Sequence, residues 1–201
     1  MNRKDPMSTT APIDPSRTAL LVMDYQPAIL ERVDDPDALA ARASVAIATL
    51  REAGATIGYV RVGFTDEDME AMPEGAPMGR VRQMPRDFIH ADSPGTQVDE
   101  RVAPQDGDIV VRKVRVGSFG TTDLDEQLRA RGVDTLVLAG ISTSGVMIST
   151  LCDAHDRDYR LFVLADATAD PEPETHAFLT ERFFPKRATV IQVADLEGLL
   201  G

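Results

Sequence analysis

Short apolar runs alternate with longer amphipathic segments along this chain. The apolar runs predict strands at residues 18–24, 55–64, 108–113, 134–140, 160–166 and 188–193, and helical periodicity predicts helices at 35–54, 121–131, 145–157 and 172–184. Continuous Val, Ile and Leu without interleaved polar residues are typical of strands buried on both faces, as in parallel sheets. The pattern therefore predicts a three-layer α/β/α, Rossmann-like fold with a mostly parallel six-stranded sheet.

Length and composition favour one domain with a full core. The chain has 201 residues, of which 43% are hydrophobic and 27% charged, and this length is short for two domains. Residues 1–15 are polar, so we expect a flexible N-terminal tail followed by a single domain at residues 16–201. Residues 65–107, rich in Pro, Gly, Met and charge, are too long for a plain loop, which predicts a lid, a binding loop or an oligomer contact.

The net charge and the cysteine content limit which partners and metals the protein can bind. The net charge is −12 and the carboxylates are dispersed, with no run of Lys or Arg, which disfavours nucleic acid and anionic membranes. No stretch reaches the roughly 18 apolar residues of a membrane span. The single cysteine, Cys152, rules out an intrachain disulfide and a Cys-rich zinc site. We expect a cytoplasmic protein with no nucleic-acid or membrane partner.

Polar residues follow three of the predicted strands at their carboxyl ends. Asp24 follows the first strand, Lys113 ends the third, and the turn at residues 142–146 follows the fourth and begins a helix. Ligands of open α/β sheets bind beyond these ends, and helix N-termini stabilise negative charge. Taken alone, the three positions fit a functional site and ordinary polar strand ends equally well. No G-x-G-x-x-G turn follows the first strand, so we expect no dinucleotide cofactor.

Four strings carry a more specific signal. They are LLVMDYQ, with Asp24 and Gln26; APQDGDIVVRKVRVGSFGTTDL, with Lys113, Ser118, Phe119 and Leu124; LVLAGISTSGV; and DYRLFVLADATAD. Together they resemble the isochorismatase-like hydrolases, the superfamily that also contains nicotinamidases and N-carbamoylsarcosine amidases. The resemblance runs from about residue 17 to residue 193 and implies a hydrolase with a small-molecule substrate that forms a homo-oligomer, a dimer or a tetramer.

The resemblance implies catalytic roles for Asp24 and Lys113, but this sequence lacks the nucleophile of the amidases. Amidases of the superfamily place a cysteine six residues after the glycine that corresponds to Gly140, and here that position is Val146. Valine has no lone pair with which to attack a carbonyl, so a thioester mechanism at this position is excluded. Cys152 lies about 9 Å further along the helix and roughly 240° around its axis, so we interpret it as a buried helix residue.

The resemblance also describes the turn before Val146. It implies a non-proline cis peptide near Ile141 and Ser142 and an oxyanion hole made by backbone N–H groups, which we assign to Gly145 and Val146. Ser142, Thr143 and Ser144 are expected to cap the helix and hold the turn. A role as replacement nucleophile stays open as an alternative for Ser144 alone. The candidate substrate-binding residues are Gln26, Phe119, Ser142, Ser144 and Gly145, together with Arg82 and Arg86.

Arg82 and Arg86 lie in the string MGRVRQMPRDF of the long connection. Two interpretations stay open: the guanidinium groups clamp a substrate carboxylate by bidentate hydrogen bonds, or they pair with acidic groups on the surface. Nicotinamidases hold a metal through an Asp-x-His pair and another His after the second strand, where this chain reads RVGFTDEDME without histidine. His90, His155 and His176 show no ligand spacing, so we expect no metal and no cofactor.

Two functional hypotheses follow. The first is a cysteine-independent hydrolase of a small carbonyl- or carboxylate-bearing molecule, in which Asp24 is the general acid or base and Lys113 orients it or stabilises negative charge. True isochorismatases of the superfamily also lack the cysteine and protonate a carbon from the aspartic acid. The second is an inactive homologue that binds a small molecule or a protein partner. Burial raises the pKa of a carboxyl group and a neighbouring ammonium lowers it, so the ionisation of Asp24 stays open.

Overall fold

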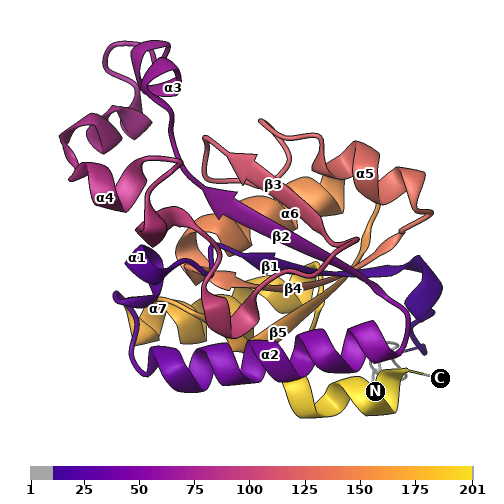
Figure 1. Cartoon of the computed structure of the whole chain (residues 1–201). Helices are drawn as coiled ribbons and strands as arrows, with labels where there is room; N and C mark the ends of the chain where they lie inside the picture. Colours follow the sequence, from indigo (N-terminus) through magenta and orange to yellow (C-terminus); the bar gives the residue numbers. More distant parts are fainter. Residues whose placement is uncertain (1–10, 201) are drawn as a thin grey trace.

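A six-stranded parallel sheet forms the centre of the protein. The computed structural model describes residues 11–200, and Figure 1 shows the sheet with helices on both faces. The strands are β1 (Thr18–Met23), β2 (Thr56–Val62), β3 (Ile109–Lys113), β4 (Thr135–Ile141), β5 (Arg160–Ala169) and β6 (Thr189–Ile191). Their order is β3-β2-β1-β4-β5-β6, and every neighbouring pair is parallel. The predicted three-layer α/β fold is confirmed.

Two hydrophobic clusters join α2 and α8 to one face of the sheet and α5 and α6 to the other. The helices are α1 (Pro27–Leu30), α2 (Pro36–Glu52), α3 (Asp66–Glu70), α4 (Arg86–Ile89), α5 (Leu124–Ala130), α6 (Ile148–Asp156), α7 (Pro173–Phe178) and α8 (Leu196–Leu199). Alternate residues of β1 point to opposite faces: Leu20 and Val22 pack with α2 and α8, whereas Ala19, Leu21 and Met23 pack with α5 and α6. This double burial explains why β1 lacks polar alternation.

Several helices differ from their predicted boundaries. The predicted helix at 145–157 begins as a π-helical turn, Thr143–Met147, before α6. The predicted helix at 172–184 is α7 followed by a second π-helical turn, Leu179–Phe183. The helices α1 and α8 were not predicted, because a helix of four residues is too short to show helical periodicity.

The long connection between β2 and β3 has structure of its own. It contains α3, α4 and three short 3-10 turns, Pro77–Gln83, Pro94–Thr96 and Glu100–Val102. Figure 1 shows α3 and α4 standing away from the sheet beyond the end of β2. A small separate core of Phe64, Met72, Val81 and Ile89 holds this part together. The methionines of the connection therefore serve, in part, as core residues.

The predicted tail at residues 1–15 lies largely outside the described residues. Within the described part, Ile13 is buried and its N–H donates to the carbonyl of Leu199 at 2.8 Å, so the packed structure includes this residue. Across residues 11–200, no helix combines the length and the apolar character that crossing a membrane requires.

The strand order leaves a crevice at the carboxyl ends of β1 and β4. From β1 the chain continues to β2 and β3 on one side, and from β4 it continues to β5 and β6 on the other. Such a switch point is where open α/β sheets bind ligands. Gly140, near the end of β4, pairs with Met23 at the end of β1. The two strand ends approach each other closely at this pair.

We expect the substitution Gly140→Ala to destabilise the fold by about 1–3 kcal/mol. A Cβ atom at Gly140 would lie 3.1 Å from the Cβ and carbonyl oxygen of Met23 and from the sulfur of Met147. Urea denaturation measures the change in the free energy of unfolding. Gly79→Ala is the matched control, because a Cβ there meets no atom within 4 Å. Equal unfolding midpoints for the Gly140→Ala variant and the wild type would contradict this close packing.

Candidate active site

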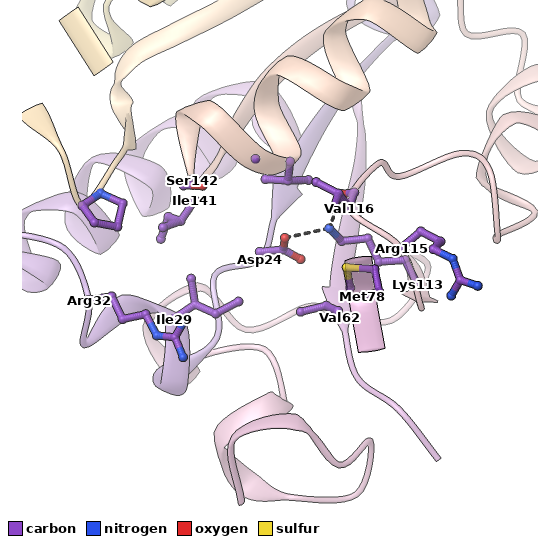
Figure 2. Close-up of a pocket in the computed structure, with 13 residues that line it drawn as sticks. Asp24, Ile29, Arg32, Val62, Met78, Lys113, Arg115, Val116, Ile141 and Ser142 are labelled. Atoms are coloured by element: carbon purple, nitrogen blue, oxygen red, sulfur yellow. Dashed lines mark hydrogen bonds and ion pairs between the residues drawn. The ribbon is translucent and has the colours of Figure 1, made fainter. Parts of the chain in front are cut away.

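A cavity of about 240 Å³ opens at the carboxyl ends of β1, β3 and β4. Figure 2 shows the side chains that line it, with the Asp24–Lys113 pair in its middle. The predicted site residues among them are Asp24, Lys113, Ser142, Gly145 and Val146. The topology therefore brings together the three strand ends that the sequence singled out. This volume is below the roughly 300–1,000 Å³ of typical ligand pockets, so only a small molecule fits.

Asp24 and Lys113 form a buried ion pair. Asp24 directly follows β1 with a φ of +59°, a left-handed conformation that aspartate adopts more readily than most residues. Its Oδ2 lies 2.8 Å from the Nζ of Lys113, and the two side chains are 7% and 2% exposed. The Nζ of Lys113 also donates to the carbonyl of Val116 at 2.6 Å. Both charged groups are thereby held at the wall of the cavity.

The second carboxyl oxygen of Asp24 takes no part in the ion pair with Lys113. This buried oxygen, Oδ1, has no hydrogen-bond partner among residues 11–200. Burial raises the pKa of Asp24 to about 6, although the charge of Lys113 lowers it. Burial therefore has a larger effect on the pKa of Asp24 than the ammonium of Lys113 has, and the sequence had left this balance open. A carboxyl group with this pKa gives up or takes a proton near neutral pH.

The turn after β4 forms the opposite wall of the cavity. The peptide bond between Ile141 and Ser142 is cis, as the resemblance implied. Val146 is 2% exposed and lines the cavity at the position of the missing cysteine. The N–H of Gly145 donates to the carbonyl of Ser142 at 3.1 Å, because the π-helical turn folds back on that carbonyl. This corrects the expectation that the Gly145 N–H is available to an oxyanion.

Residues after β5 hold this turn in place. One carboxyl oxygen of Asp170 accepts the N–H of Ser144 at 2.7 Å. The Oγ1 of Thr143 and the Nδ1 of His176 are hydrogen-bonded at 2.8 Å, and burial lowers the pKa of His176. The side chain of Ser144 is exposed and does not line the cavity, which gives it no access as a nucleophile. Asp170 was missed in the sequence, although it ends the string DATAD.

Gln26 and Phe119, both expected to bind substrate, do not line the cavity. Gln26 is 1% exposed, and its Nε2 donates to the carbonyls of Val62 and Thr96 at 2.8 and 2.7 Å. Its Oε1 accepts the N–H of Val62 at 2.8 Å. Phe119 packs in the core against Tyr159, with 6.2 Å between the ring centroids. Both side chains are therefore structural: Gln26 binds backbone groups, Phe119 packs in the core, and neither faces the cavity.

We expect Gln26→Leu to lower the free energy of unfolding by about 2–4 kcal/mol, because it removes the partner of the N–H and the carbonyl of Val62. It also removes one of two donors to the carbonyl of Thr96, which keeps the guanidinium of Arg61 at 3.3 Å. Leucine is similar in size, so most of the loss comes from hydrogen bonding. Gln127→Leu is the control, because the side chain of Gln127 makes only one hydrogen bond within the described chain, an exposed one to Asp123. Chemical denaturation compares the two variants. Equal stability of both would show that the Gln26 amide does not anchor the long connection.

The arginines that reach the cavity are not the ones expected. Arg82 donates to the carbonyls of Met69, at 2.9 Å, and Met72. Arg86 pairs with the exposed Asp66 at 2.6 Å. Neither lines the cavity, so of the two interpretations left open the structure favours pairing away from the site over the carboxylate clamp. Two other arginines, Arg32 and Arg115, line it instead.

The cysteine and the histidines lie outside the cavity lining. Cys152 packs against the cluster that joins α6 to the sheet. His90 is 9% exposed and accepts the N–H of Asp92 at 3.3 Å, and His155 is exposed on α6. Within the part of the chain that the structure describes, no three His, Cys, Asp or Glu residues are arranged to hold a metal ion.

Comparison with known proteins agrees with the fold. Residues 18–195 match the family model of the Isochorismatase domain. The chain is 35% identical to the ureidoacrylate amidohydrolase RutB of Methylobacterium radiotolerans, over 94% of this chain and 81% of that protein. N-carbamoylsarcosine amidase from Thermoplasma acidophilum is 30% identical, with a TM-score of 0.72 over 90% of this chain and 99% of that one.

A third relative, an isochorismatase family protein from Burkholderia thailandensis, superimposes with a TM-score of 0.81 at 26% identity, over 95% of this chain and 99% of that one. The protein thus has the three-layer α/β fold of these proteins, with a cavity at the carboxyl edge of its parallel sheet. It belongs to the isochorismatase family of hydrolases.

Proposed function

We propose that the protein hydrolyses a small carbonyl- or carboxylate-bearing molecule by acid–base chemistry without a cysteine nucleophile. The observation that carries this proposal is the Oδ1 of Asp24, a buried oxygen at the cavity without a hydrogen-bond partner among residues 11–200, on a carboxyl group whose pKa is about 6. Val146 supplies no nucleophile, so water attacks the substrate directly.

Each residue of the pair has a distinct role in this mechanism. As general acid, Asp24 donates its proton to the substrate while the water oxygen bonds to the reacting carbon, and the added water then returns a proton to the carboxylate. The bond from that carbon to the leaving group breaks as Asp24 transfers a proton from the new hydroxyl to the leaving group. As general base, Asp24 instead takes a proton from water as the water oxygen bonds to the carbon, and gives this proton to the leaving group as the bond to that group breaks. Lys113, held by Asp24 and the carbonyl of Val116, orients the carboxyl group and stabilises negative charge. The backbone N–H of Val146 is the remaining donor that we assign to an oxyanion.

A substrate panel tests the proposal. Vinyl ethers, amides, esters and ureides are incubated with the protein, and bond cleavage is followed by NMR. Cleavage of one class supports a hydrolase and identifies the bond. If no compound is cleaved but some of them stabilise the fold, the inactive binding homologue is favoured instead.

We also expect a homo-oligomer, a dimer or a tetramer, that works in the cytoplasm without nucleic acid, metal or cofactor. Family membership supports a small-molecule substrate. Light scattering measures the mass in solution, and a mass equal to the 21.8 kDa of one chain contradicts the oligomer.

A further inference from the structure

The cavity is positively charged although the protein is strongly acidic. Its ionisable lining residues are Asp24, Arg32, Lys113 and Arg115. Three of these four groups are cations, whereas the chain as a whole has a net charge of −12. A local excess of positive charge inside a low-dielectric wall attracts anions. The site is therefore suited to a negatively charged ligand.

The three cations differ in what they already bind. Lys113 is bonded to Asp24 at 2.8 Å and to the carbonyl of Val116 at 2.6 Å. One nitrogen of Arg115 donates to the carbonyl of Val114 at 2.6 Å. The guanidinium of Arg32 makes no hydrogen bond or ion pair with any of residues 11–200. Arg32 therefore has its full set of donors available to a ligand.

Arg32 lies in a position to hold one end of a molecule whose other end meets Asp24. It follows α1, and its N–H donates to the carbonyl of Ile29 at 3.0 Å, which fixes its backbone near the cavity. Figure 2 shows Arg32 beside Ile29 on one side of the Asp24–Lys113 pair and Arg115 on the other side. Ile29 and Val62 line the cavity as well, so an apolar surface accompanies the charged groups.

We propose that Arg32 selects the substrate by binding its carboxylate, so that the substrate is an anion and not merely a carbonyl compound. This inference rests on the proposed function for the reaction at Asp24. A guanidinium binds a carboxylate through two parallel N–H···O hydrogen bonds. Arg115 adds a second positive charge at the mouth of the cavity. Arg32 thus acts in binding, and Asp24 acts in the reaction.

Binding of simple acids tests this inference without a known substrate. The probes are benzoate and butyrate, with benzamide and butyramide as uncharged partners of the same shape, titrated by ligand-observed NMR. We expect wild-type protein to bind the acids at least about tenfold more tightly than the amides. Arg32→Gln is expected to abolish this preference. Because Arg32 is exposed, the substitution leaves the core unchanged.

Arg82→Gln and Arg86→Gln are matched controls, because neither arginine lines the cavity. Both are expected to bind the acids as the wild type does. Equal affinity of acids and amides, no binding of either acid, or an Arg32→Gln variant with wild-type preference would overturn the inference. An Arg32-dependent preference without turnover of any panel compound would therefore refute the proposed function but not the role of Arg32.

Discussion

Replacing Asp24 with asparagine is expected to reduce turnover by about 10²–10⁴-fold. Asparagine keeps the shape of the side chain and an oxygen that faces Lys113, but it cannot release or accept a proton near neutral pH. The measurement is the kcat of the panel compound that the wild type cleaves. Asp66→Asn is the control, because Asp66 is exposed and pairs with Arg86 away from the cavity. Unchanged kcat in the Asp24→Asn variant would show that another group moves the proton.

The pH profile of the wild type identifies which proton transfer Asp24 performs. Its pKa is about 6. If Asp24 is the general acid, kcat/KM falls as pH rises above about 6, because the protonated form disappears; if it is the base, kcat/KM falls below about 6. In the Asp24→Asn variant, the fall in kcat/KM around pH 6 is expected to be absent. A flat wild-type profile between about pH 5 and 8 contradicts both roles.

The same raised pKa predicts a change in stability that requires no substrate. A carboxyl group that holds its proton more tightly in the native state stabilises that state at low pH. This contribution is fully present below the ordinary carboxyl pKa of 3.8 and is lost as pH rises through about 6. Urea denaturation of the wild type and the Asp24→Asn variant across this range is expected to show the loss only in the wild type.

The substitution Val146→Cys is expected to create amidase or esterase activity at least about 100-fold above that of Val146→Ala. Val146 lines the cavity that also contains Asp24 and Lys113, so a thiol there has an acid–base group and an ammonium as neighbours. Cysteine is close to valine in size, and the fold is expected to tolerate it at a cost of about 1 kcal/mol. Ester hydrolysis and alkylation by iodoacetamide measure the gain.

The alkylation pattern provides the control for this experiment. The sequence has one cysteine, Cys152, which lies on α6 and packs half-buried against the core. Faster alkylation of the Val146→Cys variant therefore reports the new thiol. A folded variant that is neither alkylated faster nor active would mean that the turn does not present position 146 to the cavity.

The fold was predictable because the strands are buried on both faces. The run from Ala19 to Met23 is apolar at every position, and the structure places alternate residues in two separate clusters. Short helices such as α1 and α8 were not predictable, since four residues carry no periodic signal. The π-helical turn at Thr143–Met147 was also missed, because a one-residue change in hydrogen-bond spacing leaves no mark on the apolar pattern.

The site was predictable as far as strand ends determine it. Asp24 and Lys113 meet because β1, β2 and β3 are neighbours with aligned carboxyl ends. Gln26 is only two residues from Asp24, but its side chain turns to the backbone of Val62, and sequence spacing does not show that direction. The path of the long connection, which separates Arg82 from the cavity, depends on a small core formed only in the folded chain.

One NMR time course shows whether hydrolysis depends on Asp24 and on no cysteine. Wild type, Cys152→Ala and Asp24→Asn are mixed in parallel with the substrate panel under identical conditions. We predict that the Cys152→Ala variant cleaves the same bond at the wild-type rate and that the Asp24→Asn variant does not. Cleavage that is lost in the Cys152→Ala variant and survives in the Asp24→Asn variant would contradict cysteine-independent hydrolysis by Asp24.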